Sequence, residues 1–354
     1  MNYIYHKFLE DAGQRSFDPE HRRRLDHNIG RYDVQVQEGK LRYKNLDLAR
    51  RRAANTKHKI INNLDKYLVE FENNFSKRGG KVIWAPSEKD AQREILNIVK
   101  KAKAQVIVKQ KTMVSEEIEL NELLEKNKRE VFETDLGEYI VQLAGEKPYH
   151  ILTPAMHKSK EDVAQLFHEK FNLPAGSPPS QITRFVREKL RGEFLRADVG
   201  ITGANFLLAD VGAVALTENE GNGLLCMSFP RIHIVIAGIE KLLPSIEDLD
   251  LFLPLLAQHG TGQYLTVYNN LVFGPRSEGE PDGPEEMYVI LLDNRRTEVL
   301  RFREQRRALS CIRCGACLNG CPIYRSVGGY TYKATYSGPI GSVISPHYLG
   351  MKEY

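Results

Sequence analysis

Residues 81–110, KVIWAPSEKDAQREILNIVKKAKAQVIVKQ, contain two short apolar runs on either side of an amphipathic segment. The run KVIWAP opens the stretch and QVIVKQ closes it, and both are typical of strands. Between them Ser87 can cap a helix, with Asp90 three residues later as a weak capping box. The apolar face of that helix is formed by Ala91, Ile95, Leu96 and Val99. The order strand, helix, strand predicts a βαβ unit with parallel strands.

The same alternation extends in both directions from this stretch. An amphipathic helix is expected at 59–78, where Gly79-Gly80 ends it. Further helical segments are expected at 115–127, 136–145, 159–171 and 180–197. Further strands are expected at 130–134, 150–154, 212–216, 232–239, 263–273 and 286–294. Strands separated by helical segments of 10–15 residues predict an α/β fold with a mostly parallel sheet.

The composition is that of a globular protein with a sizeable core. The chain has 354 residues, of which 42% are hydrophobic and 27% are charged. At about 150 residues per domain, this length predicts two domains, with room for additional arms. The net charge of +4 is too small to indicate nucleic-acid binding across the whole chain.

Positive charge is concentrated near the N-terminus. Residues 1–59 carry fourteen Lys and Arg against eight Asp and Glu, including the clusters Arg22–Arg24 and Arg50–Arg52. We interpret residues 1–58 as a basic, mainly helical arm that is exposed to solvent. A surface for docking a partner is the sharper alternative. RNA binding ranks third, because no aromatic-rich recognition motif accompanies the charge.

No targeting or membrane segment is evident. The start, MNYIYHKFLEDAGQ, lacks the apolar region of a signal peptide, and no apolar stretch approaches the ~20 residues that span a bilayer. We therefore expect a cytoplasmic protein. Disulfides are rare in that compartment, so clustered cysteines there are more often metal ligands.

Four of the five cysteines lie in CIRCGACLNGCPIYR, residues 311–325. Cys311, Cys314, Cys317 and Cys321 have the spacing C-x2-C-x2-C-x3-C followed by proline, which is the bacterial ferredoxin run for a [4Fe–4S] cluster. Such a loop can wrap three irons with its amides directed at the sulfurs, and Gly315 and Gly320 permit a tight backbone. The spacing therefore indicates an iron–sulfur cluster.

Two other uses of these thiols fit the sequence less well. Structural zinc sites usually combine two C-x2-C pairs separated by a longer stretch, which fits this run poorly, and a disulfide is disfavoured by the compartment. In two-cluster proteins the fourth cysteine of the run ligates the other cluster. Cys321 therefore either closes a single cluster or belongs to a second one. Cys226, the remaining cysteine, is interpreted as a buried structural thiol.

Three segments contain candidate ligand-binding residues. TENEGN (217–222) follows a strand-like run, so Glu218, Asn219, Glu220 and Asn222 could form a site at a strand end, although the motif alone favours a polar turn that closes a hairpin. GITGAN (200–205), with Thr202 and Asn205, could direct backbone amides at an anion, but it is no nucleotide fingerprint. TPAMHKS (153–159) places His157 and Lys158 after a strand, where they could equally bind an acidic substrate or form a solvated strand end.

Several segments, taken in order, resemble the lactate-utilisation protein B family. They are TDLGEYIVQLAGEKPYHILTPAMHKS, GITGANFLLADVGAVALTENEGN, FPRIHIVIAGIEKL, YNNLVFGPRSEGEPDGPEE and CIRCGACLNGCPIYR. The resemblance covers essentially the whole chain, and the ordered set is more specific than the cysteine run alone. The chain departs from the family pattern at LLADVGAV (207–214), where Asp210-Val211 occupy the place of a Glu-Thr pair.

The resemblance implies a domain organisation. Residues 59–300 would form a lactate-utilisation (LUD) α/β domain, similar to the three-layer isomerase and CoA-transferase folds. Residues 301–354 would form a small helical ferredoxin-type module. Family members carry a second cysteine run after the segment YSGPIGSV, here 336–343, so we expect this chain to be truncated and its module incomplete. The complete protein would hold two [4Fe–4S] clusters, with Cys321 ligating the second.

The resemblance also implies a function. The chain would be the electron-transfer subunit of a cytoplasmic complex that oxidises L-lactate to pyruvate, together with other subunits of the lactate-utilisation system. The LUD domain would then bind a partner or a small anionic ligand. The alternative is a stand-alone enzyme that binds a small acid or acyl group and carries only a structural cluster. In that case Glu218 or Glu220 would be the catalytic carboxylate.

Overall fold

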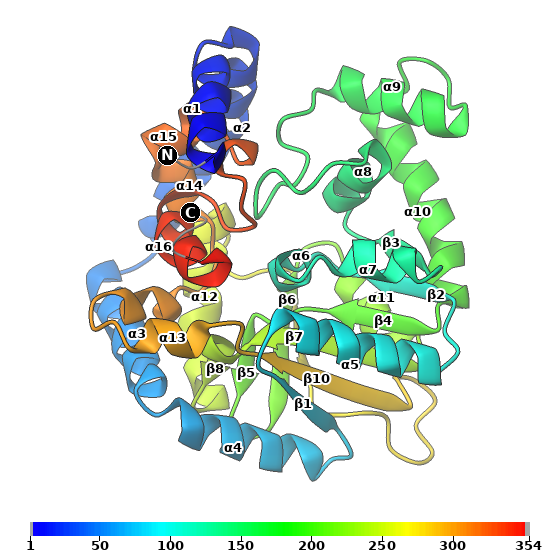
Figure 1. The fold of residues 1–354 in the computed structure, drawn as a ribbon, viewed down its shortest axis with the longest axis vertical. Coiled ribbons are helices and arrows are strands. Elements are labelled where there is room, and N and C mark those ends of the chain that lie inside the picture. The colour runs from blue at the N-terminus through cyan, green and yellow to red at the C-terminus, as the bar shows by residue number, and fades with distance from the viewer. Residues whose placement is uncertain (1–2, 351–354) are drawn as a thin grey trace.

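A six-stranded parallel sheet forms the centre of the computed structural model, which describes residues 3–350 (Figure 1). Its strands, in spatial order, are β1 (Lys81–Ala85), β10 (Glu286–Leu292), β7 (Ile232–Gly238), β4 (Val199–Thr202), β2 (Val106–Lys109) and β3 (Glu130–Glu133). All five pairings between neighbours are parallel. The predicted α/β fold with a parallel sheet is therefore confirmed.

The central strands are apolar on both faces because both faces are covered. Every residue of β7 is buried. Ile232, Ile234 and Ile236 pack on one face with α5 (Glu88–Lys101), α6 (Met113–Glu117) and α7 (Leu120–Lys126). Val235 and Ala237, which alternate with them, pack on the other face with α4 (Leu64–Ser76) and a second sheet. Strand periodicity thus sets the layer to which each side chain belongs.

The second sheet is smaller and mixed. Its spatial order is β8 (Leu242–Leu243), β5 (Phe206–Leu208), β6 (Ala213–Glu218) and β9 (Tyr268–Val272). The pairing of β5 with β8 is parallel, and the other two pairings are antiparallel. A third layer of helices covers the β2 and β3 end of the central sheet: α8 (Leu136–Ala144), α9 (Lys160–Phe171) and α10 (Pro179–Arg196). The short helix α11 (Asn222–Ser228) follows β6.

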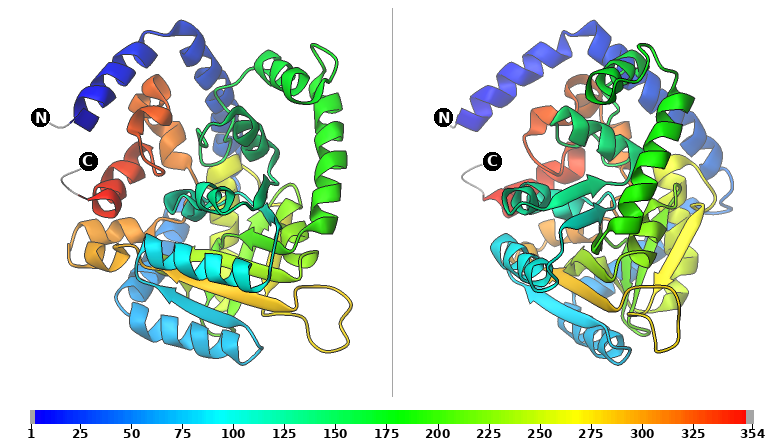
Figure 2. Two further views of the ribbon diagram at one scale, coloured as in Figure 1. Left: turned by 45° about the vertical axis from the view of Figure 1, so that its right-hand side comes forward. Right: turned by 90° about the vertical axis from the view of Figure 1, so that its right-hand side faces the viewer.

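Two helical groups lie outside the α/β layers. The N-terminal arm contains α1 (Tyr3–Ser16), α2 (Pro19–Lys40) and α3 (Leu46–Ile61). The C-terminal group contains α13 (Arg296–Leu300), α14 (Ala316–Gly320), α15 (Pro322–Val327) and α16 (Gly338–Leu349). Figure 2 shows the orange and red C-terminal helices between the blue arm and the α/β layers. The arm also contacts α12 (Leu249–Thr261), so it holds the C-terminal group against the domain.

The opening βαβ unit forms as its sequence predicts. Ser87 Oγ accepts the backbone N–H of Asp90, and the Asp90 carboxylate accepts the Ser87 hydroxyl at 2.6 Å. The helix α5 then runs to Lys101, and β2 begins at Val106. The predicted boundaries of the three domains remain predictions. No helix within residues 3–350 is long and apolar enough to span a bilayer.

Three predicted elements are wrong in part. The helix expected at 59–78 is divided between α3 and α4. The side chains of Asn62 and Asn63 form hydrogen bonds with residues of the preceding turn, which ends α3. The helix expected at 115–127 breaks at Glu119, whose φ of 47° is left-handed. The strand expected at 263–273 is shorter and becomes β9.

The strand expected at 150–154 does not form. His150 Nδ1 accepts the backbone N–H groups of Leu152 and Thr153, and the Tyr149 N–H donates to the Pro154 carbonyl. These bonds close the segment into a turn, so its apolar residues face the C-terminal helices instead of a sheet neighbour.

The tight contact between β4 and α11 generates a stability prediction. A Cβ at Gly200 would lie 1.9 Å from the Cys226 carbonyl oxygen, which belongs to a buried backbone. We expect Gly200→Ala to lower the free energy of unfolding by at least about 2 kcal/mol, measured by urea denaturation. Gly192→Ala is the matched control, because that glycine is an open position inside α10 and should gain about 0.5–1 kcal/mol. Equal effects of the two substitutions would contradict the prediction.

Candidate metal centre

A cavity of about 1260 Å³ separates the α/β layers from the C-terminal helices. Its walls come from α3, α6, α12, the turn at 146–151 and the segments 310–318 and 329–340. Cys311, Cys314 and Cys317 all line it. Residues that are distant in the sequence therefore enclose three of the four clustered thiols.

The backbone of the cysteine segment directs amides at sulfur. Arg313 has a left-handed φ of 60°, and its N–H donates to Cys311 Sγ at 3.4 Å. The N–H of Tyr324, at the start of α15, donates to Cys321 Sγ at 3.4 Å. Amides directed at thiolates stabilise the charged form that binds metal. Backbone amides of Ala316 and Ile340 are likewise directed at Cys314 and Cys317, so the expectation of such amides is met.

The two glycines of this segment have different roles. Gly315 has a φ of 77°, and a Cβ there would lie 2.9 Å from Ile151 Cγ2, so the turn requires glycine. Gly320 has no left-handed φ, and its surroundings are open. The interpretation of Gly320 as a tight-turn residue is therefore wrong, since its role could be taken by another small residue.

Cys321 does not line the cavity. It is partly buried against an apolar cluster that includes Leu25, Ile29 and Tyr149, and Cys317 packs against the same cluster. By the spacing rule, the fourth cysteine of such a run serves another cluster.

The sulfur positions fit a multi-atom group better than a single ion. All five cysteines are free thiols. A tetrahedral zinc ion with Zn–S bonds of about 2.3 Å would require sulfurs that are ~4 Å apart. Among the described residues, only Glu116, Glu133 and Glu138 bring three potential ligand atoms within 4.8 Å of one another. No three cysteine sulfurs lie that close together among the described residues, and a cluster, unlike one zinc ion, has separate corners for separate thiolates.

The three acidic residues form a buried ion-pair cluster. Lys109 Nζ lies 2.7 Å from Glu133 Oε1 and 3.2 Å from Glu116 Oε1. Burial and repulsion from Glu133 raise the pKa of Glu138 well above its usual value. The ammonium group thus already occupies the place that a metal ion would take.

A charged network connects the cysteine segment to the central sheet. Arg296 Nε donates to Glu240 Oε2 at 2.6 Å, and Arg313 Nη2 lies 3.4 Å from Glu240 Oε1. Arg296 also pairs with Glu117, which accepts the Tyr336 hydroxyl at 2.6 Å. Burial alone would raise the pKa of Glu240, but attraction to Arg296 and Arg313 outweighs it and lowers the pKa to about 2. Glu240, just after β7, is therefore ionised.

Burial has the opposite effect on two of the thiols. It raises the pKa of Cys314 to about 11 and raises that of Cys317 as well. Since the thiolate is the form that ligates metal, binding would release their protons. The cations beside Cys311 would offset the negative charge that results.

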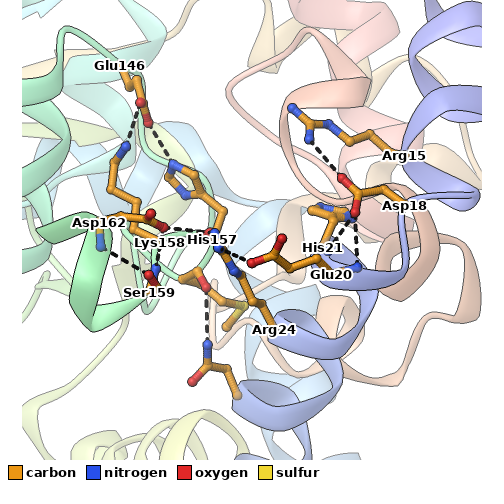
Figure 3. Close-up of polar contacts among 12 residues, drawn as sticks. Arg15, Asp18, Glu20, His21, Arg24, Glu146, His157, Lys158, Ser159 and Asp162 are labelled. Atoms are coloured by element: carbon orange, nitrogen blue, oxygen red, sulfur yellow. Dashed lines mark hydrogen bonds and ion pairs between the residues drawn. The ribbon is translucent and has the colours of Figure 1, made fainter.

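The candidates His157 and Lys158 already have protein partners (Figure 3). His157 Nε2 lies 2.6 Å from Glu146 Oε2, and Lys158 Nζ donates to Glu146 Oε1 at 2.7 Å. Arg24 of α2 donates to the His157 carbonyl and to Asp162. These contacts tie the N-terminal arm to the turn beside the cysteines. Ligand binding by His157 and Lys158 remains a prediction.

Glu218, Glu220 and Asn222 lie at the end of β6, as predicted. The Glu218 carboxylate accepts the N–H groups of Gly223 and Leu224 at 2.6 and 2.8 Å, so it caps α11. Asn222 Nδ2 donates to Thr134 Oγ1 at 3.2 Å. Partial desolvation raises the pKa of Glu220 to about 7, and repulsion from Asp135 is the second-largest cause. Because the Glu220 side chain is exposed, water weakens both effects.

Thr202 and Asn205 connect neighbouring segments. Thr202 Oγ1 lies 2.8 Å from His233 Nε2 in the buried sheet, and Asn205 Oδ1 accepts the Thr217 N–H at 2.8 Å. Asp210, the residue that departs from the family pattern, accepts the Ile246 N–H at 3.1 Å. These observations account for the three side chains structurally, and ligand binding at Thr202 and Asn205 remains untested.

Several residues in and around the centre were not predicted from the sequence. Lys111 and Asp135 form an ion pair, with Nζ 2.9 Å from Oδ2, and lie beside Glu220. Each of the two directly follows a predicted strand, and this position could have identified them from the sequence. His150 Nε2 lies 3.1 Å from Asn319 Oδ1 and joins the 150–154 turn to α14. Glu240 and Arg296 carried no motif, because their partners lie more than fifty residues away.

Two protein families match parts of the chain. Residues 68–292 match the LUD domain, and residues 307–353 match the 4Fe-4S dicluster domain, which includes all four clustered cysteines. A protein described as uncharacterized electron transport protein YkgF, from Escherichia coli (strain K12), is 43% identical over 305 residues, which cover 86% of this chain and 64% of that protein.

Another relative is lactate utilization protein B 2 of Bacillus mycoides (strain KBAB4), which is 45% identical over 294 residues, or 83% of this chain and 62% of that protein. The chain thus spans less than two thirds of the length of these relatives. A crystal structure of a DUF162 family protein from Deinococcus radiodurans aligns with a TM-score of 0.36 at 12% identity, covering 65% of this chain and 98% of that protein.

The buried pair of Thr202 and His233 generates a pH prediction. Burial lowers the pKa of His233 to about 3, against 6.5 in the unfolded chain. The unfolded state therefore binds the extra proton between pH 6.5 and 3, so this stability is present above pH 6.5 and is lost as the pH falls. We expect His233→Gln to reduce the loss of unfolding free energy between pH 7 and 4.5 by about 2–3 kcal/mol, measured by urea denaturation.

The exposed His27→Gln variant controls for the removal of a histidine as such. An unchanged loss between the two pH values in His233→Gln would contradict the assignment of acid sensitivity to this buried ring.

Proposed function

Because this chain belongs to the LUD domain family and carries a 4Fe-4S dicluster segment, we propose that it is an iron–sulfur electron carrier of a lactate-utilisation system. The name lactate utilization protein B, carried by relatives that are about 44% identical, supports the choice of system. The electrons would come from oxidation of L-lactate to pyruvate.

The observation that carries the proposal is the convergence of three thiols on one cavity. Cys311, Cys314 and Cys317 would hold one [4Fe–4S] cluster, and Cys321 would contribute to a second. When bound, such a cluster supplies one-electron transfer, with potentials that range from about −700 to +450 mV among proteins. The amide of Arg313 and the turn at Gly315 orient the loop for this role.

The residues around the cavity would prepare it for a charged cofactor. Ile151, Leu318 and Ile340 place apolar surface beside the cysteines, which limits water access and strengthens electrostatic interactions. The His150–Asn319 contact fixes α14, which lies between Cys314 and Cys321. The chain's own contribution would thus be to bind, to orient and to shield.

The proposal extends to compartment and partners. Five free thiols, four of them within eleven residues, are compatible with a reducing compartment, so we place the protein in the cytoplasm. It would exchange electrons with other subunits of the lactate-utilisation system. The LUD domain would bind a partner or a small anionic ligand, for which the strand-end residues Lys111, Glu218 and Glu220 are candidates.

A second candidate function is a stand-alone enzyme that acts on a small acid or acyl group. The observation that favours it is Glu220, whose pKa is raised to about 7 beside Lys111 and Asp135 at the carboxyl ends of the strands. Glu220→Gln would then abolish turnover while leaving iron content unchanged. In the electron-carrier proposal, the same variant retains electron transfer.

Iron content tests the electron-carrier proposal. We expect anaerobically produced protein to bind iron and sulfide and to give a cubane EPR signal after dithionite reduction. Cys317→Ser should lose at least half of the bound iron, because a thiolate at the cavity is removed. Cys226→Ser is the matched control, since Cys226 is buried beside Thr134, away from the cavity, and should keep its iron. Bound zinc in place of iron, or equal iron loss in both variants, would contradict the proposal.

A further inference from the structure

One arginine of the cysteine segment is buried with part of its guanidinium unsatisfied. The Arg313 side chain is 8% exposed and lines the cavity between Cys311 and Cys314. Its Nη2 faces Glu240, and its guanidinium lies 4.5 Å from the centre of the Tyr336 ring. Its Nη1 has no hydrogen-bond partner within residues 3–350. A buried N–H without an acceptor is costly, which indicates an acceptor that the polypeptide itself does not supply.

Cationic side chains gather on the inner side of Arg313. Arg296 and Arg313 both face the carboxylate of Glu240, and Arg296 also pairs with Glu117. Lys57 is buried and donates to the backbone carbonyls of Glu240 and Leu242, and the adjacent Lys241 is also buried. An anionic group bound in the cavity beside Arg313 would therefore meet positive charge on this side.

Cys311 lies close to these cationic side chains. The Arg313 backbone N–H donates to Cys311 Sγ at 3.4 Å, and both residues line the cavity. Lys57 lines the same cavity. A cluster held by thiolates is an anion, and its charge becomes more negative by one on reduction. The buried cations would therefore interact more strongly with the reduced form.

We propose that Arg313 sets the reduction potential of the cluster at Cys311, Cys314 and Cys317, an inference that rests on the proposed iron–sulfur function. Its fixed positive charge stabilises the reduced cluster and raises the midpoint potential, since net charge and hydrogen bonds to sulfur are among the determinants of that potential. Reduction adds one electron from the donor, and no bond to Arg313 forms or breaks. Arg313 is thus a tuning residue, not a ligand.

Glu240 positions Arg313 and moderates its effect. Its Oε1 faces Arg313, and its Oε2 accepts from Arg296, so one carboxylate holds both guanidinium groups. Glu240 follows β7, the strand at the centre of the sheet. The LUD domain would accordingly contribute to the potential of the cluster through a single buried charge.

The test is an EPR-monitored redox titration of the full chain, produced and reconstituted anaerobically. Arg313→Gln should shift the midpoint to a more negative potential, and Arg313→Lys should lie closer to the unmodified chain because the charge is retained. Glu240→Gln should shift the midpoint to a more positive potential, since a neighbouring negative charge is removed. Arg307→Gln is the matched control, because it removes the same charge at an exposed position four residues before Cys311.

Opposite shifts in Arg313→Gln and Glu240→Gln, with no shift in Arg307→Gln, would support the proposal, because general disruption of the site predicts shifts of the same sign. Full iron content with an unchanged midpoint in Arg313→Gln would overturn it. If Arg313→Gln binds no iron, Glu240→Gln decides, and a midpoint at or below that of the unmodified chain overturns the proposal. An unmodified chain that binds no iron would overturn the proposed function itself, and this inference with it.

Discussion

The arrangement of this molecule depends on the ion pairs that the buried carboxylate of Glu240 forms with Arg296 and Arg313. This carboxylate is 1% exposed and lies at the carboxyl end of the central strand, where an isolated charge would be highly unfavourable. Arg296 satisfies it from the segment after β10, and Arg313 from the cysteine segment. Because removing one partner of a buried ion pair costs about 3–5 kcal/mol, these pairs favour one position of the C-terminal helices over others.

The cavity follows from that position. The C-terminal helices close over the ends of the strands, and the N-terminal arm packs against α14 and α15 from outside. Arg24 of the arm also donates to the His157 carbonyl, which ties the arm to the neighbouring turn (Figure 3). His21 Nε2 lies 2.6 Å from the Tyr149 hydroxyl, and the Tyr149 carbonyl accepts the Tyr324 hydroxyl of α15. The arm, the turn and the cysteine segment therefore form a continuous set of contacts. A metal centre in this place would be shared by three parts of the chain.

Several sequence-based expectations failed where tertiary contacts outweighed local preference. The apolar residues of 150–154 resemble a strand, yet His150 closes them into a turn that packs on Gly315. The apolar pattern of 59–78 is continuous, yet two asparagines divide the helix. Among the candidate ligand residues, Glu218 was located correctly at the end of a strand, but its carboxylate caps a helix.

The sequence by itself determined the α/β class, the parallel strands and the four cysteines, because hydrophobic periodicity and ligand spacing are local properties of the chain. Only the tertiary structure decided that Cys311, Cys314 and Cys317 line one cavity and that Cys321 does not. It also decided that Lys57 lines the same cavity as Cys311, and that Glu240 pairs with both Arg296 and Arg313. Those residues come from segments up to 256 positions apart, and no local pattern records their proximity. Burial in a common interior lowers the effective dielectric constant, so charges that would interact weakly in water interact strongly there.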